Sequence, residues 1–279
     1  MARRFFFSLI SLLILGMGAF LIPANPAAGQ EMAGGEVDLA PYRAVYGLLL
    51  DRADFQSGII GAEGEMVIEW LEECDGWSSS QSLTMGLDES SGDYIEAETR
   101  YASWESRDGA TMRFNIRNSH NGALSEHYSG VATLKSPNGG GLAEYSVPKG
   151  LTIELPEGTI FPTRHLLEMI ASAKLGKRVL SRIVFDGATE EGMFEINAVI
   201  GSPRKVKEQN VRLDPSLNLS YWPVRLAFFN LDSAQDLPEY ETSIHLVANG
   251  VSRELILDFG GFVIRAVLDK YEPLEKPAC

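Results

Sequence analysis

The chain has 279 residues, with 24 lysines and arginines against 38 aspartates and glutamates, so its formal net charge at neutral pH is -14. This balance excludes ordinary nucleic-acid binding, which needs a basic surface that displaces counterions, and it disfavours anionic lipid head groups for the same reason. The length accommodates one large all-β domain or two smaller ones.

Residues 1–29 have the three parts of a secretory signal peptide: Arg3 and Arg4, an apolar stretch over 5–22, and small residues before Gln30. We expect cleavage before Gln30 and a soluble protein in the periplasm. The net charge then changes from -14 to -16, because two arginines and no acidic residue are removed. The alternative is that the apolar stretch stays as a membrane anchor, since roughly 17 to 25 residues span a bilayer.

Short β-like runs separated by turn residues dominate the rest of the chain. In its first half we expect strands over 42–50, 64–71, 77–87, 94–104, 111–118, 124–134, 142–147 and 151–155. Asn121-Gly122 lies between two of these runs and tolerates the positive φ angles of tight hairpin turns. The glycine-rich segment 137–141 suits either a domain boundary or an exposed loop, and we favour the loop.

One helix is predicted, over 163–175, with Thr163 as its N-cap after Pro162 and with Gly176 as its stop. Apolar residues three or four apart give it one face that packs on a core. His165 lies in the first turn, where its ring is expected to bond a loop carbonyl and hold the helix to the sheet. Pro162, Thr163 and His165 are therefore interpreted as a structural helix start, with proton transfer by His165 as the alternative.

Strands resume after the helix. We expect them over 178–185, 192–200, 220–229, 240–247, 252–259 and 262–268. Many antiparallel strands with a single helix predict an all-β fold in which the sheet curls into a spiral or half-open barrel, because a long open sheet would expose two edges. Residues 30–279 are expected to form one such domain.

The chain has two cysteines, Cys74 and Cys279. In an exported protein, a pair with no cysteine left over predicts one disulfide bond, formed in an oxidising compartment. That bond would join the C-terminal tail to an early strand.

The sequence carries no nucleophile elbow, zinc-protease motif, phosphate-binding loop or dinucleotide fingerprint. We therefore expect no catalytic residues, cofactor or metal. His120 and His127 flank the Asn121-Gly122 turn, but two ligands without a cysteine or carboxylate cluster are insufficient for a metal site, so we expect ordinary surface residues. One alternative remains: a hydrolase whose two catalytic carboxylates are distant in the sequence and come together only in the folded chain.

Aromatic residues suggest an apolar surface. Trp70, Trp104, Trp222 and Phe228 are candidate lining residues of a groove that binds a lipid, an acyl chain or an extended peptide. The alternative is that they belong to an ordinary core.

Several segments, taken in order, resemble the cell-envelope-integrity family of EipB type, a periplasmic group from alphaproteobacteria. They are Tyr42-Arg43-Ala44-Val45-Tyr46, Ser57-Gly58-Ile59, Gly61, Trp70, Cys74, Phe161-Pro162-Thr163-Arg164-His165, Phe185-Asp186-Gly187, Trp222-Pro223-Val224, Pro238-Glu239-Tyr240-Glu241, Asn249-Gly250-Val251 and Cys279. The resemblance implies a curved β-spiral with a helix, similar to the lipoprotein carriers LolA and LolB and closed by the disulfide. It also implies a role in supporting the envelope during growth and division, and it offers no catalytic residues.

We therefore expect a non-enzymatic periplasmic monomer that supports envelope integrity and division by binding another envelope component, such as a protein. The alternative is a carrier that holds a lipid, acyl chain or lipopeptide against the concave face of the sheet.

Overall fold

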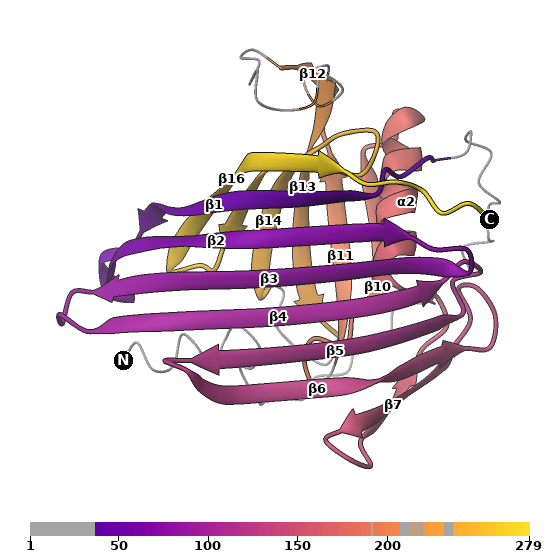
Figure 1. Cartoon of the computed structure of the whole chain (residues 1–279), viewed down its shortest axis with the longest axis horizontal. Coiled ribbons are helices and arrows are strands. Elements are labelled where there is room, and N and C mark those ends of the chain that lie inside the picture. Colours follow the sequence, from indigo (N-terminus) through magenta and orange to yellow (C-terminus); the bar gives the residue numbers. More distant parts are fainter. Residues whose placement is uncertain (1–36, 191, 207–213, 215–216, 218–219, 232–236) are drawn as a thin grey trace.

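The computed structural model describes residues 37–279 except 191, 207–213, 215–216, 218–219 and 232–236. The predicted signal peptide and its cleavage point at Gln30 lie outside the described residues. The described chain forms a single large sheet wrapped around its own inner face, together with one α-helix (Figure 1). Among the described residues, no helix has the length and apolar character needed to cross a membrane.

Most strands coincide with predicted runs, but β2 begins earlier and β16 ends later than predicted, and β12 was not predicted. Those before the helix are β1 (Tyr42–Ala53), β2 (Ile59–Glu72), β3 (Gly76–Glu89), β4 (Tyr94–Ser106), β5 (Thr111–His120), β6 (Ala123–Leu134), β7 (Gly141–Val147), β8 (Thr152–Leu155) and β9 (Thr159–Ile160), with a short 3-10 helix η1 (Phe55–Ser57) after β1. Those after it are β10 (Val179–Phe185), β11 (Met193–Ile200), β12 (Arg204–Lys205), β13 (Ser220–Asn230), β14 (Tyr240–Leu246), β15 (Ser252–Asp258) and β16 (Phe262–Pro273).

The order of the strands in the sheet is β8-β7-β6-β5-β4-β3-β2-β1-β16-β15-β14-β13-β11-β10-β9. The first and last strands of the described chain, β1 and β16, are therefore neighbours in the middle of the order. The two ends of the order, β8 and β9, are consecutive in sequence and separated only by residues 156–158. The sheet thus closes almost completely into a barrel and leaves only short edges, which confirms the predicted curled all-β fold. The likeness to LolA and LolB stays a prediction.

The barrel is flattened into two layers whose strands cross. Figure 1 shows β1 to β7 as a front layer, with β10, β11, β13 and β14 behind it and α2 standing at the end where the C-terminus lies. The inward side chains of both layers form the main core, which includes Tyr46, Leu48, Ile264 and Ala266, each at most 1% exposed. Alternation of buried and exposed residues along β1 places one side of that strand in the main core. The same alternation along β5 places Met112 and Phe114 in a second, smaller core cluster.

The helix α2 (Pro162–Lys174) begins one residue before the predicted start. Thr163 is not its N-cap, because the chain already has helical geometry at Pro162 and the cap position belongs to Phe161, whose side chain forms no cap hydrogen bond. Proline suits the first helical position because its φ angle is preset and an N–H there has no intrahelical partner. The predicted cap residue therefore lies inside the first turn.

The C-terminal end of α2 is as predicted. Gly176 has a φ of 72° and follows the last turn. Its N–H donates to the carbonyl of Ala173 at 3.0 Å, and the N–H of Lys177 donates to Ser172 at 2.9 Å. This pattern satisfies carbonyls that the helix leaves without partners.

The helix links β9 to β10, which form the parallel pair of an otherwise antiparallel described sheet. It packs against β10 and β11, and Met169, Ile170 and Ala173 point into the main core. The two-residue strand β9 was not predicted, because two residues carry no periodic pattern. Residues 135–140 form the connection between the paired strands β6 and β7, in agreement with the loop interpretation.

Candidate functional site

The two ends of the barrel differ in their connections. One end, called here the disulfide end, carries α2, the β2–β3 connection and the C-terminal tail. The other, called the open end, carries the turns after β1, β3, β5 and β15. Backbone hydrogen bonds of 2.8 to 2.9 Å tie these turns together: Asp54 N–H to Gly261, Ser90 N–H to Gly58, and Asn121 N–H to Glu96.

The predicted disulfide between Cys74 and Cys279 is present, with the two Cα atoms 5.6 Å apart. This separation lies within the normal range for a disulfide. Cys74 follows β2 and Cys279 ends the chain, so the bond joins positions 205 residues apart in sequence. It fixes the C-terminal tail at the disulfide end of the barrel.

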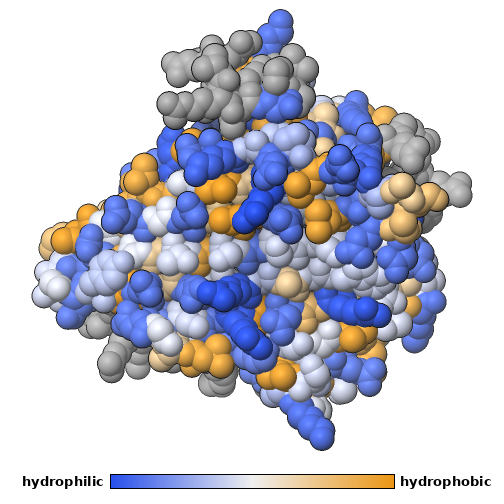
Figure 2. Space-filling view, in the orientation of Figure 1, coloured by the Kyte–Doolittle hydropathy of each residue, from blue (hydrophilic) through white to orange (hydrophobic). Residues whose placement is uncertain are grey.

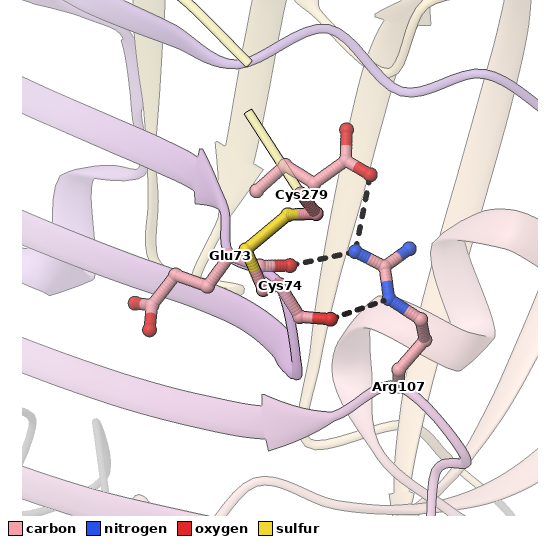
Figure 3. The surroundings of a disulfide bond; sticks show 5 residues. Glu73, Cys74, Arg107 and Cys279 are labelled. Carbon is pink, nitrogen blue, oxygen red and sulfur yellow. Dashed lines mark hydrogen bonds and ion pairs between the residues drawn. A yellow bond between two sulfur atoms is a disulfide. The ribbon is translucent and has the colours of Figure 1, made fainter. Parts of the chain in front are cut away.

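Arg107, in the turn after β4, lies beside the disulfide (Figure 3). Its guanidinium donates to the carbonyl of Glu73 at 2.6 Å and to that of Cys74 at 3.4 Å, and it lies 3.2 Å from the Glu72 carboxylate. The same group stacks over the ring of Trp77 at 5.0 Å. Arg107 therefore holds the cysteine-bearing connection against the neighbouring strands.

The tail that leads to Cys279 is anchored before it reaches the disulfide. The N–H of Leu274 donates to the carbonyl of Pro41 at 2.9 Å. Lys276 forms ion pairs with Asp38 and, at 3.3 Å, with Glu72. The two ends of the described chain thus meet near the last residue of β2.

The start of α2 is capped from the sheet by Glu105, a β4 residue that is 2% exposed. Its carboxylate accepts the N–H of Thr163 at 2.9 and 3.0 Å and the hydroxyl of Thr163 at 2.8 Å. Burial raises the pKa of Glu105 to about 7, although these hydrogen bonds act in the opposite direction. The sequence analysis missed this residue, because a single glutamate in a strand gives no sign of a helix 58 residues away.

His165 is buried, at 5% exposed, but its Nε2 atom has no hydrogen-bond partner among the described residues. Burial lowers its pKa to about 4, so the ring is neutral near pH 7. The expected bond from this ring to a loop carbonyl is not found among the described residues. The connection from helix to sheet is made instead by Glu168, which accepts from Arg164 at 2.9 Å and from Arg182, on β10, at 2.7 Å.

His120 and His127 do not face each other across their hairpin. In the paired strands His120 lies opposite Ala123, and His127 lies opposite Arg117. The described residues contain no group of three or more histidines, cysteines or carboxylates placed to hold a metal.

A cavity of about 220 Å³ opens between the two layers of the barrel toward the open end. Most of its wall is apolar: Leu48, Leu83, Met85, Ala97, Ile116, Ala188, Phe194, Tyr240, Leu257, Phe259 and Ile264. Its polar lining residues are Gln81, Glu98, Thr99, Asn118, His120, Glu126, Asp186 and Thr189. The cavity is therefore an apolar pocket with a small number of polar groups, which is the usual composition of a binding site.

None of the four predicted groove residues lines this cavity. Trp70 is 6% exposed and packs in the core, 6.3 Å from the ring of Trp77. Trp222 is half-buried and packs against the same core. Phe228 comes nearest, because its ring stacks at 4.2 Å on Tyr240, which is a lining residue.

Trp104 lies on the outer face of the sheet. Its neighbours Ser103 and Glu105 occupy the buried, inward positions of β4, so the alternation of the strand turns Trp104 outward. There its ring packs under the guanidinium of Arg113, 4.9 Å away. The expectation that Trp104 lines an inner groove is wrong.

Two polar residues stand out in the cavity wall. Asn118 is 6% exposed and donates to the Glu126 carboxylate at 2.9 Å, while its own carbonyl oxygen Oδ1 has no donor among the described residues. Asp186 accepts the N–H of Ala188 at 2.9 Å, and burial raises its pKa to about 6. Its backbone carbonyl accepts the hydroxyl of Tyr101 at 3.0 Å, which fixes the loop after β10 to the front layer.

Exposed apolar side chains surround the open end. Phe55, Ile60 and Leu124 are at least 60% exposed, and each lies in or next to a turn at this end. Figure 2 shows hydrophobic residues at the left edge of the molecule, where the turns that follow β1 and β3 lie in Figure 1. We call these three residues the apolar rim. Exposed apolar groups gathered around a pocket are typical of interaction sites.

A family model with the description EipB-like matches residues 33–275. The chain belongs to the EipB-like family. Its relatives in this family include the cell envelope integrity protein EipB of Brucella abortus (strain 2308), which is 31% identical over 249 residues, or 88% of each chain. A crystal structure of a beta-barrel-like protein with a domain of unknown function, also from Brucella abortus, superimposes with a TM-score of 0.79 at 29% identity and covers 86% of this chain and all of that one.

Membership of the EipB-like family agrees with the sequence resemblance, and the segments that carried it lie at both ends of the barrel. Residues 161–165 form the start of α2 beside Glu105. Asp186 and Tyr240, from two other segments, line the cavity, and the two cysteines form the disulfide. In this EipB-like chain the cavity with its apolar rim is the candidate functional site.

Proposed function

We propose that this chain supports the integrity of the cell envelope by binding another envelope component, a protein, at the open end of its barrel. The relationship to the EipB protein of Brucella abortus, named for cell envelope integrity, supports the general role. One observation carries the more specific part of the proposal: the cavity and the apolar rim lie at the same end of the molecule.

The size of the cavity favours a protein partner. At about 220 Å³ it is smaller than the ~300–1,000 Å³ of typical small-molecule pockets. A single apolar side chain of a partner fits such a space, and side chains seated in pockets are what dominates many protein interfaces. The rim would then pack against the surface around the inserted side chain.

The proposal also includes a compartment and a non-enzymatic mode of action. We propose the periplasm as the compartment, because disulfides form and persist in oxidising compartments. We also propose a non-enzymatic role, because binding alone accounts for the cavity and its rim. We extend the same proposal to the envelope during cell division.

The apolar lining of the cavity favours a second candidate, a carrier of a lipid, acyl chain or lipopeptide. In that case one end of an apolar chain would occupy the cavity, and the rest would lie along the rim. The purified protein is denatured, and any ligand that it releases is identified by mass spectrometry. Recovery of an apolar ligand would support this candidate.

The protein-binding proposal is tested by cross-linking and pull-down from envelope extracts with a Phe55→Asp/Ile60→Asp variant. A matched control is Val179→Asp/Val199→Asp, because these valines are 65% and 55% exposed but pair at the end of β10 and β11 that is remote from the cavity residues Asp186 and Phe194. We expect the unmodified chain and the control to recover the same partner, and the rim variant to lose it. Equal recovery by both variants, or recovery of no protein by the unmodified chain, would contradict the proposal.

A further inference from the structure

We propose that the cavity at the open end takes an apolar group that ends in an ammonium, and that it disfavours an apolar group that ends in a carboxylate. This inference rests on the proposed binding function and names the chemistry that the bound component presents to the cavity. It follows from the polar groups of the wall, which are described in turn below.

The first observation concerns charge. The described residues that line the cavity include the carboxylates Glu98, Glu126 and Asp186 but no lysine or arginine. Glu98 is paired with Arg100, a residue of the outer face, at 2.8 Å and is not counted further. Glu126 and Asp186 remain, on opposite layers of the barrel, so the cavity is bounded on two sides by acidic groups.

The second observation is the carbonyl oxygen Oδ1 of Asn118. The side chain lies on the inward face of β5, in line with the buried Phe114 and Ile116. Its amide nitrogen is used by Glu126, which fixes Oδ1 as the end that still requires a donor. A buried acceptor without a donor costs free energy, and a ligand that carries N–H groups removes that cost.

The third observation is that Asp186, the acidic group on the other layer, has no cation paired with it in the part of the chain that the structure describes. Burial is the first cause of the raised pKa of Asp186, and hydrogen bonds from backbone N–H groups only partly offset it. A bound ammonium would favour the ionised carboxylate by direct attraction. A bound carboxylate would place like charges together in an apolar space, which is unfavourable.

The apolar part of the ligand is accommodated by the rest of the wall. Leu83, Met85 and Ile116 come from the front layer, and Phe194 and Tyr240 come from the back layer. The aromatic rings among them also suit a cation, since ammonium groups are attracted to ring faces.

The experiment compares octylamine, octanol and octanoate, which share one alkyl chain, by titration calorimetry with the full oxidised chain at about 0.15 M salt, where distant surface charges are screened. We expect octylamine to bind at least about tenfold more tightly than octanoate, because a charged donor meets acceptors in place of a repelled anion. Octanol should fall between the two. Octanoate binding that equals or exceeds octylamine binding would overturn the inference.

Variants then show whether the amine binds in the cavity or on the acidic surface. Asp186→Asn and Asn118→Leu should each weaken octylamine binding by about tenfold, and Asp186→Asn should leave octanol binding unchanged. Asn115→Leu is the matched control, because Asn115 lies on the same strand but faces away from the core and contacts His127 at 3.2 Å. Octylamine binding that none of these variants alters would be surface binding and would overturn the inference. Asp186→Asn is nearly isosteric, so the test holds even where Asn118→Leu lowers stability.

A displacement experiment with bound octylamine distinguishes two sources of the ammonium, a lipid and a protein. A short-chain phosphatidylethanolamine represents a lipid head group, and a lysine-containing apolar peptide represents a protein. Displacement by the peptide supports a protein partner, and displacement by the lipid supports the carrier. Failure of both to displace it would overturn the inference.

This inference and the proposed function fail in different ways. Octanoate binding that is tighter than octylamine binding, and that the cavity variants alter, would refute the preference for an ammonium. It would leave the protein-binding function supported if the pull-down still recovered a partner. Loss of partner recovery would refute the protein-binding function whatever amphiphile the cavity prefers.

Discussion

Glu105 and Thr163 join the sheet to the helix: the carboxylate of one accepts both the N–H and the hydroxyl of the other at 2.8 to 3.0 Å. The positive end of the helix dipole points at this carboxylate, so a negative charge there is favourable. Because the position is buried, the same charge is expensive to desolvate, and the pKa of Glu105 rises to about 7.

This balance predicts a pH-dependent stability. The folded pKa of Glu105, about 7, lies above its ordinary value of 4.5. Its contribution is therefore full below pH 4.5 and is lost as the pH rises through 7. Relative to Glu105→Gln, the unmodified chain should lose about 3 kcal/mol of unfolding free energy between pH 4.5 and pH 8. Urea unfolding of both proteins at several pH values measures this, and a difference that stays constant with pH would contradict it.

The hydroxyl of Thr163 should contribute separately. Thr163→Val keeps the shape of the side chain but removes the donor to Glu105, so we expect a loss of about 1–3 kcal/mol in unfolding free energy. Thr163→Ser keeps the hydroxyl and is the control, with a smaller loss. Equal losses in the two variants would show that packing, and not the hydrogen bond, accounts for the effect.

The disulfide predicts a stability that depends on redox conditions. Closing a loop of 205 residues stabilises the folded chain by on the order of 5 kcal/mol in the chain-entropy model, as an upper figure. Cys279→Ser should lower the thermal midpoint in oxidising buffer and have little effect in reducing buffer, where the unmodified chain also lacks the bond. A loss of the same size in both buffers would mean that the bond is not formed in solution.

The positions of Trp70 and Trp104 predict unequal effects of the same substitution. Trp70→Ala removes a ring that is 6% exposed and should cost about 3–5 kcal/mol, because it leaves a cavity in the core. Trp104→Ala removes an outer ring stacked on Arg113 and should cost about 1 kcal/mol or less. Chemical unfolding with a tyrosine or far-ultraviolet signal compares them, and similar costs would place both rings in the core.

Gly187 and Gly122 form another matched pair. Both have positive φ angles, 66° and 75°, so an alanine at either is strained. At Gly187 the added methyl also overlaps the ring of Phe114, whereas at Gly122 it meets nothing within 4 Å. We expect Gly187→Ala to cost about 1–3 kcal/mol more than Gly122→Ala. Equal thermal midpoints would refute the close approach of the loop after β10 to this core ring.

The strands were predictable because their alternation is local. In β5, Met112, Phe114 and Ile116 are buried in turn, and exposed or half-buried residues separate them. The Gly176 stop and the Asn121-Gly122 turn were predictable for the same reason, since both depend on residues that tolerate positive φ angles.

The face of a strand was less predictable where polar residues point inward. On β4 the buried positions next to Trp104 are occupied by Ser103 and Glu105. A prediction from side-chain hydrophobicity therefore places the ring of Trp104 on the wrong face of the sheet. The inversion has a tertiary cause, because Glu105 is needed inside to cap α2. Thr163 was assigned as the N-cap because no local pattern reveals a cap supplied by a distant strand.

The cavity could not be derived from the sequence at all. Its lining residues come from both layers, and two of them, Asn118 and Asp186, lie far apart in the chain. Only the pairing of β1 with β16 and the adjacency of β8 and β9 bring them around one space. The strand β9 has only two residues, which is too short for a periodic pattern, so the near-closure of the barrel at β8 and β9 could not be predicted.

The bond between Cys74 and Cys279 turns the chain from one cysteine to the other into a covalent circle. A protease that cuts once anywhere within that circle produces two pieces that remain linked, so a nicked molecule is not shed as fragments. Tension applied between the N-terminal end of the described chain and its last residue passes through the cysteines and stretches only the part before Cys74. The helix α2 and the strands from β3 onward are thereby shielded from a mechanical load applied at those two points.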